Sequence, residues 1–247
     1  MAGRIRVGIG GWTFEPWRGV FYPKGTRQAD ELAYASRHVT AIEVNATYHG
    51  TQKPESFARW AATAPEGFVF ALKANRFCTN RRVLAEGGES VGKFLSQGIA
   101  ELGDKLGPIL WQFMPTKRFD PDDFAAFLAF LPARVAGLPL RHCVEVRHES
   151  FLAPEFAALC RGHDVAICLA HHETFPAIDE VTAGFTYARL MMSSEAIETG
   201  YAAADLDAWA GRFKTHADEG RDVFAFFISS DKVRNPAAAQ ALIQRLG

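Results

Sequence analysis

The 247-residue sequence predicts a single (β/α)8 barrel, the TIM-barrel fold, over residues 1–247. Short apolar segments with strand-like alternation are separated by helical patterns, which is typical of a parallel sheet. Eight such units in about 250 residues match the usual size of this barrel. No shift in composition marks a second domain. An open, doubly wound sheet is the alternative, but Gly8-Ile9-Gly10-Gly11 is too short to be a dinucleotide-binding motif.

Four strand–helix units are expected in the first half of the chain. Strands, which alternate apolar with small or polar residues, are expected over 4–10, 40–45, 68–73 and 107–113. Helices, which begin where proline or aspartate favours a first turn, are expected over 28–37, from Pro54, over 89–102, and from an Asp120 cap to Pro132. The loop 11–27 is aromatic, glycine-rich and long, which indicates a functional loop.

Four more units complete the predicted barrel. Strands are expected within 141–150 and over 164–170, 185–190 and 222–229. Helices are expected from Pro154, from an Asp205 cap and from Asn235-Pro236. The segment 171–184 shows no helical pattern, so we expect an irregular unit between strands six and seven.

The polar residues of these strands share one parity and gather near the strand ends. Because side chains alternate across a strand, Glu145 and Arg147 point one way and Val144 and Val146 the other. The polar side comprises Glu43, Asn45, Lys73, Gln112, Glu145, Arg147 and Arg189. In a barrel this side faces the lumen, and these side chains converge at the C-terminal mouth, where barrel enzymes keep their chemistry. The alternative is an ion-pair network that only fills the lumen.

A series of motifs between residues 10 and 148 resembles the YecE-like family, a domain of unknown function (number seventy-two) whose members are uncharacterised TIM-barrel proteins. The motifs are Gly10-Gly11-Trp12, Trp17-Arg18-Gly19-Val20-Phe21-Tyr22-Pro23, Glu43-Val44-Asn45-Ala46-Thr47-Tyr48, Lys73-Ala74-Asn75-Arg76 with Thr79, Leu110-Trp111-Gln112-Phe113 and Glu145-Val146-Arg147-His148. The resemblance implies a TIM barrel and a site at its mouth, and it implies no reaction.

The last third of the chain departs from the pattern of that family. The family tends to have Asp where this chain has His171, His-Gly where it has Met191-Met192, and two Asn where it has Ser229-Ser230. Asn80 also replaces a usual His. These replacements are typical of a divergent member with altered ligand specificity.

The predicted catalytic residues are Glu43, Glu145 and Lys73. Two carboxylates with different neighbours can have separated pKa values, as acid/base or hydrolytic chemistry requires. A closely spaced pair would permit glycosidase-like chemistry, whereas glutamates locked to arginines would count against it. The alternative is that Lys73, Arg147 and Arg189 keep both glutamates as ionised partners.

The predicted ligand is a small anionic or sugar-like molecule, with a phosphate or a carboxylate as the anionic group. Arginine binds such groups through a bidentate fork, and lysine adds a point charge. The predicted ligand-binding residues are Trp12, Asn45, Tyr48, Arg76, Gln112, Arg147, His148 and Arg189. A metabolite sensor without turnover is one alternative. A nucleic-acid-binding or processing protein that uses the basic 76–82 loop is another, although the net charge of −1 disfavours it.

No cofactor is indicated, and the metal signal is weak. Glu43, Glu145, His148 and His171 could supply ligands, but no HExxH or close His-x-His spacing occurs. The cysteines (Cys78, Cys143, Cys160 and Cys168) form no CxxC pair, so we expect buried thiols, with a catalytic Cys78 as the alternative. Neither a signal-peptide core nor a membrane-spanning run is present, so the predicted location is the cytoplasm.

Overall fold

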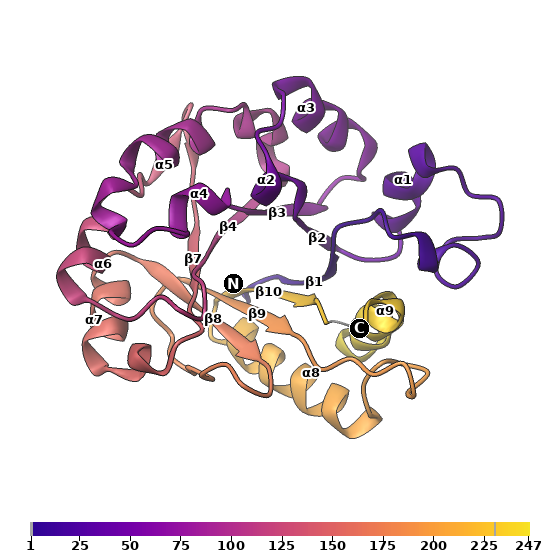
Figure 1. The fold of residues 1–247 in the computed structure, drawn as a ribbon. Helices are drawn as coiled ribbons and strands as arrows, with labels where there is room; N and C mark the ends of the chain where they lie inside the picture. The colour runs from indigo at the N-terminus through magenta and orange to yellow at the C-terminus, as the bar shows by residue number, and fades with distance from the viewer. Residues whose placement is uncertain (1, 230) are drawn as a thin grey trace.

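The computed structural model, which describes residues 2–229 and 231–247, is a closed barrel of eight parallel strands with helices around it (Figure 1). The order of the strands around the barrel is β1-β10-β9-β8-β7-β4-β3-β2. Their bounds are β1 Ile5–Gly10, β2 Ala41–Val44, β3 Val69–Lys73, β4 Leu106–Gln112, β7 His142–Glu145, β8 Val165–His171, β9 Phe185–Leu190 and β10 Asp222–Phe227. The predicted TIM-barrel fold is confirmed.

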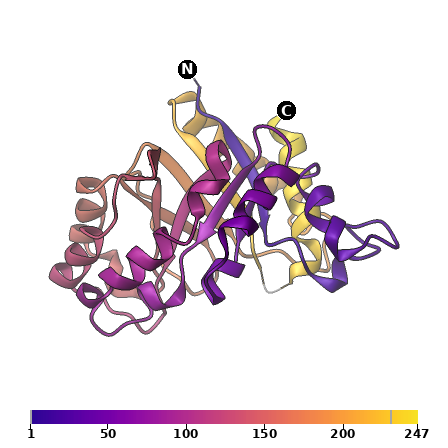
Figure 2. The same cartoon turned by 90° about the horizontal axis from the view of Figure 1, so that it is seen from above.

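The helices pack outside the barrel, and β1 and the last helix bring the two ends of the chain to one side of the molecule (Figure 2). Their bounds are α1 Glu31–Ala35, α2 Ala46–His49, α3 Pro54–Thr63, α4 Arg76–Thr79, α5 Gly88–Leu95, α6 Pro121–Leu128, α7 Pro154–Gly162, α8 Ala203–Asp218 and α9 Asn235–Leu246. The loop 11–27 and α1 project from the barrel wall (Figure 1). Between β8 and β9 the described chain has no helix, as expected of the irregular unit.

Several predicted helix boundaries are wrong, each for a local reason. The helix expected over 89–102 ends at Leu95, because Gly98 takes a left-handed conformation with φ of 105° and a 3₁₀ helix follows over Ile99–Lys105. Helix α6 ends at Leu128, well before Pro132. Helix α8 begins at Ala203, so Asp205 lies inside its first turn rather than capping it. By contrast, the Asp120 carboxylate does cap α6, where it accepts from the Asp123 N–H at 3.1 Å.

A short hairpin between α6 and β7 was not predicted. It consists of β5 Arg134–Val135 and β6 Leu138–Pro139, which pair antiparallel outside the barrel. Each strand has only two residues, so no alternating pattern could reveal it.

The core has two layers, and they confirm the predicted parity of the strands. The larger apolar cluster, which includes Val7, Ile42, Leu72 and Val144, lies between strands and helices. The smaller cluster fills the lumen with Ala41, Val69, Ala71, Leu110, Cys143, Ala166, Cys168, Phe185, Tyr187, Phe224 and Phe226. Gly8 belongs to the lumen side, where a Cβ would lie 1.9 Å from the carbonyl oxygen of Ala41. Only glycine therefore allows β1 and β2 to approach this closely.

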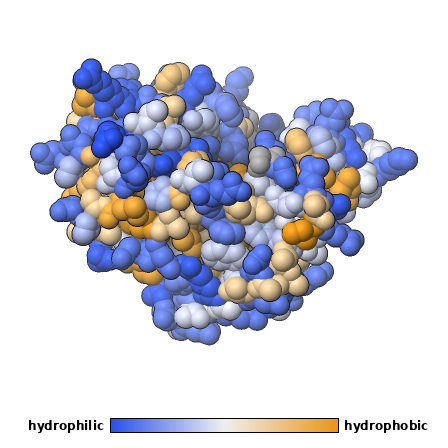
Figure 3. Space-filling model, turned by 60° about the horizontal axis from the view of Figure 1, so that its bottom comes forward, coloured by the Kyte–Doolittle hydropathy of each residue, from blue (hydrophilic) through white to orange (hydrophobic). Residues whose placement is uncertain are grey.

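The face of the molecule that Figure 3 shows is mostly hydrophilic, with apolar side chains scattered over it in small groups. Among the described residues, the exposed large apolar side chains are Val20, Phe77, Val83, Met114, Leu152, Val181 and Ile197. None of the described helices is long and apolar enough to cross a bilayer.

Candidate functional site

A buried ion network closes the lumen at the C-terminal end of the barrel. Arg189, on β9, donates from Nε to Oε2 of Glu43 at 3.1 Å and from Nη2 to Oε1 of the same carboxylate at 3.2 Å. Its Nη1 donates to Oε2 of Glu145, on β7. Both glutamates are fully buried. One guanidinium thus bridges carboxylates from two strands, and the bidentate geometry fixes their orientation.

Two further side chains complete the hydrogen bonds of these carboxylates. The Tyr187 hydroxyl donates to Oε2 of Glu43 at 2.7 Å. Arg147 donates from Nε to Oε1 of Glu145 at 2.7 Å, and its guanidinium lies 4.4 Å from the centre of the Phe175 ring. Burial raises the pKa of Tyr187, and Glu43 raises it further, so this hydroxyl remains a neutral donor.

The charges of the network keep Glu145 ionised. Burial alone would raise its pKa, but the adjacent cations, Arg189 first and Arg147 second, bring that pKa below its usual value. The pKa of Arg189 is raised, because the two carboxylates outweigh the effect of burial. Two carboxylates and two guanidiniums leave the network without net charge. This arrangement corresponds to the alternative in which both glutamates are ionised partners, and it counts against glycosidase-like use of the pair.

Lys73 is a cation of the lumen that has no acidic partner among the described residues. It ends β3, is 9% exposed, and places Nζ 4.1 Å from the centre of the Tyr48 ring. Its Nζ forms no salt bridge or hydrogen bond with any described residue. Burial lowers the pKa of Lys73 to about 8, and the positive charge of Arg189 acts in the same direction. Near neutral pH the amine is therefore mostly protonated, but about one molecule in ten is neutral at pH 7, far more than for an ordinary lysine.

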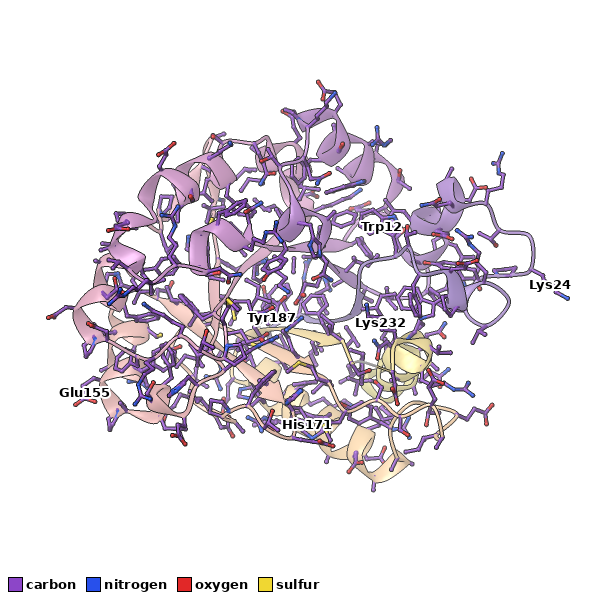
Figure 4. All side chains as sticks on the ribbon, viewed as in Figure 1. Trp12, Lys24, Glu155, His171, Tyr187 and Lys232 are labelled. Carbon is purple, nitrogen blue, oxygen red and sulfur yellow. The ribbon has the colours of Figure 1, made fainter. Side chains whose placement is uncertain are left out.

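A cavity of about 440 Å³ opens beside Lys73 at the mouth of the barrel. Its lining residues come from the ends of β1, β2, β3, β9 and β10 and from the segments that follow them: Gly10, Gly11, Trp12, Thr13, Val44, Asn45, Ala46, His49, Lys73, Arg189, Ile228, Ser229, Lys232 and Asn235. No Asp or Glu occurs among these described lining residues, while Lys73 and Lys232 contribute uncompensated positive charge. We call this space the mouth cavity. Figure 4 shows Trp12 and Lys232 beside the barrel interior marked by Tyr187.

The structure brings only part of the predicted ligand-binding set to the mouth cavity. Trp12, Asn45 and Arg189 line it, together with Lys73, which was predicted as a catalytic residue. Tyr48 lies against the amine of Lys73 without lining the cavity itself.

The other predicted ligand-binding residues lie elsewhere. Arg147 is bonded to Glu145 and does not line the cavity, and His148 caps a short 3₁₀ helix by accepting from the Ser150 N–H. Arg76 is exposed on the rim, near Phe77. Gln112 is buried and does not line the cavity, and its Oε1 has no hydrogen-bond partner among the described residues.

Sequence reasoning missed five polar or charged contributors to this cavity. They are Thr13, His49, Ser229, Lys232 and Asn235. Ser229 donates to Oδ1 of Asn235 at 2.6 Å, which ties the end of β10 to the start of α9. The position of Lys232, just after the eighth strand, is the signal that could have revealed it, because such segments form barrel mouths. Ser230, the neighbour of Ser229 in the divergent pair, lies outside the described residues.

The side chains considered as metal ligands do not meet. No group of three or more His, Cys, Asp or Glu side chains placed to hold a metal ion occurs in the described chain. Glu43 and Glu145 are engaged by Arg189, while the His171 ring bonds the Tyr201 hydroxyl at 3.1 Å. Cys78 is buried, and burial raises the pKa of its thiol to about 12, which does not fit a reactive cysteine.

The sequence of this chain matches the profile of one protein family. The profile of the family described as "Protein of unknown function DUF72" matches residues 6–247. UPF0759 protein YunF of Bacillus subtilis (strain 168) is 25% identical over 158 residues, which are 62% of this chain and 54% of that protein. The chain thus spans about half the length of that curated relative.

Solved structures support the fold. A DUF72 family protein from Thermotoga maritima MSB8 superposes with a TM-score of 0.74 at 21% identity, over 98% of this chain and 97% of that one. A DUF72 family protein from Enterococcus faecalis V583 superposes with a TM-score of 0.71 at 18% identity, over 99% of both chains. At these identities the likeness concerns the fold alone.

Proposed function

The chain belongs to the DUF72 family, whose description assigns no reaction, and we propose that it is an enzyme. The proposed reaction is acid/base chemistry on a small anionic molecule bound at the mouth of the barrel. One observation carries this proposal. The mouth cavity is lined by Lys73 and Lys232 without any described Asp or Glu, beside an ion network that already balances its own charges. A bound phosphate or carboxylate would supply the missing negative charge.

Lys73 is the group that we expect to move protons. General acid–base groups are most effective when their pKa lies near the working pH, and burial brings the pKa of Lys73 to about 8. Its position at a strand end of the barrel is where catalytic residues of this fold occur. Glu43 and Glu145 support this role indirectly, because they hold Arg189 rigidly in the wall of the same cavity.

The remaining lining residues suit a small polar ligand. Trp12 offers an aromatic surface, and Asn45 offers an amide. The cavity volume of about 440 Å³ falls in the range of small-molecule sites.

Lys232→Met tests the anion site at its exposed edge. Phosphate, glycerol phosphate and pyruvate are titrated against the wild type in a thermal-shift assay. A ligand at about one hundred times its Kd stabilises by about 2.7 kcal/mol, and each kcal/mol corresponds to about 2–4 °C in a chain of this size. We expect at least one anion to raise Tm by several degrees. Lys232→Met should reduce its affinity about fivefold, which is about 1 kcal/mol.

Lys24→Met is the matched control, because Lys24 is exposed at the far end of the projecting loop (Figure 4). It should bind the same anion with wild-type affinity. Equal loss of affinity in both variants, or no Tm shift by any of the three anions, would contradict an anion site in the mouth cavity.

A further inference from the structure

The amine of Lys73 has the surroundings of a nucleophile as well as those of a proton carrier. It lies in the wall of a cavity that admits a small molecule, and no described carboxylate holds it. The neighbouring guanidinium of Arg189 disfavours a second positive charge at this position. Lysines that form covalent intermediates are activated in this way, by burial and by nearby cations.

Resting on the proposed function, we propose that Lys73 attacks the carbonyl carbon of a small oxo acid or oxo phosphate in the mouth cavity and forms a Schiff base with it. The substrate class is then an aldehyde or ketone that carries a carboxylate or phosphate. Lys232 is the cation available for the anionic group at the outer part of the cavity. Lys73 would therefore react with the carbonyl end of the ligand, while Lys232 would bind its anionic end.

The surroundings of Lys73 also suit the product of this step. A Schiff base of lysine is positively charged when protonated. The Tyr48 ring, 4.1 Å from Nζ, offers its negative face to that charge. The carboxylates of Glu43 and Glu145 also favour a positive charge at Lys73. The ring and the two carboxylates would therefore offset part of the cost that burial and Arg189 impose on a positive charge at this position.

The step balances without any further reactant. The lone pair of the neutral amine forms a C–N bond as the carbonyl π electrons move to oxygen, which takes up a proton to give a carbinolamine. Loss of that oxygen as water leaves the protonated imine. The net change is ammonium plus carbonyl compound to iminium plus water, with no change in total charge and no oxidation. His49, an imidazole in the same lining, is the group available to carry the proton to the departing oxygen.

Reductive trapping tests this proposal on the intact chain. The protein is incubated with pyruvate and sodium cyanoborohydride near pH 7.5, and peptide mass spectrometry measures the modified fraction of each lysine over time. Because its pKa is about 8, Lys73 holds far more neutral amine at this pH than an ordinary lysine. We expect it to react at least about tenfold faster than Lys24. Acetone, which replaces the carboxylate of pyruvate with a methyl group, should be trapped at Lys73 more slowly than pyruvate.

Lys73→Arg keeps the positive charge but removes the nucleophile. It should bind pyruvate, as judged by the Tm shift, without any adduct at position 73. If pyruvate raises Tm in the wild type and Lys73 is trapped no faster than Lys24, the Schiff base is wrong and the anion site stands. If pyruvate produces neither a Tm shift nor selective trapping, the Schiff base fails, and the proposed function fails with it only if phosphate and glycerol phosphate also leave Tm unchanged.

Discussion

Arg189→Met is expected to lower the free energy of unfolding by about 3–5 kcal/mol, the cost of leaving buried charges without their partner. Arg189 is 2% exposed and donates to both Glu43 and Glu145, which are fully buried. Without it, among the described residues, Glu43 keeps only the Tyr187 hydroxyl and Glu145 keeps only Arg147. Urea unfolding at pH 7, monitored by tryptophan fluorescence, measures the change.

Arg161→Met is the matched control for that variant. Arg161 bonds Glu180 at 3.1 Å on the surface, where both side chains are about half exposed, and an exposed pair contributes at most about 1 kcal/mol. Adding Glu43→Gln to Arg189→Met should recover part of the loss, because one buried charge disappears with its partner. A loss in Arg189→Met no larger than that in Arg161→Met would contradict the bridging role of this guanidinium.

Lys73→Met is expected to raise the stability of the fold while abolishing anion binding in the mouth cavity. A lysine whose pKa falls from 10.5 to about 8 on folding destabilises the folded state at neutral pH. At 1.36 kcal/mol per pH unit, the penalty is about 3 kcal/mol. Methionine fills similar space without a charge, so the variant should unfold at higher urea concentration than the wild type at pH 7.

The sign of the pH dependence follows from proton binding. Between about pH 8 and pH 10.5 the unfolded chain holds a proton on Lys73 that the folded chain has released, so wild-type stability rises with pH in this window. Below pH 8 both states are protonated and the full penalty applies. The stability difference between Lys73→Met and the wild type should therefore shrink from pH 8 to pH 10.5. A difference that is absent at pH 7, or that is independent of pH, would contradict a buried, unpaired Lys73.

The fold and the inner part of the site follow from local patterns in the sequence. Alternation along single strands was enough to place Glu43, Lys73, Glu145 and Arg189 on the lumen side, because a closed parallel barrel leaves each strand only two faces. The same alternation could not show that one guanidinium bridges the two glutamates, because this depends on how β7, β9 and β2 face each other across the lumen.

The outer part of the site is formed by segments whose sequences show neither strand-like nor helical periodicity. Lys232 and His49 reach the mouth cavity from the segments that follow β10 and β2, whose course is set by packing against distant elements. Arg147 has the parity of a lumen residue but does not line the mouth cavity. Its guanidinium instead bonds Glu145 and lies against the ring of Phe175, beyond the end of the strand. Some helix ends also differ from the predicted ones. Near Gly98, for example, a residue in the left-handed conformation prevents the α-helix from continuing.

Direct titration of the Lys73 amine tests the central claim, which is that this side chain has no acidic partner in the free protein and binds an anionic ligand. Its ¹³Cε and ¹⁵Nζ resonances, assigned by their absence in Lys73→Met, are followed by NMR against pH with and without the anion that gives the largest Tm shift. We predict a pKa of about 8 in the free protein, raised by the bound anion because the anion favours the charged form. A pKa near 10.5 without ligand, or one that saturating anion leaves unchanged, would contradict the account.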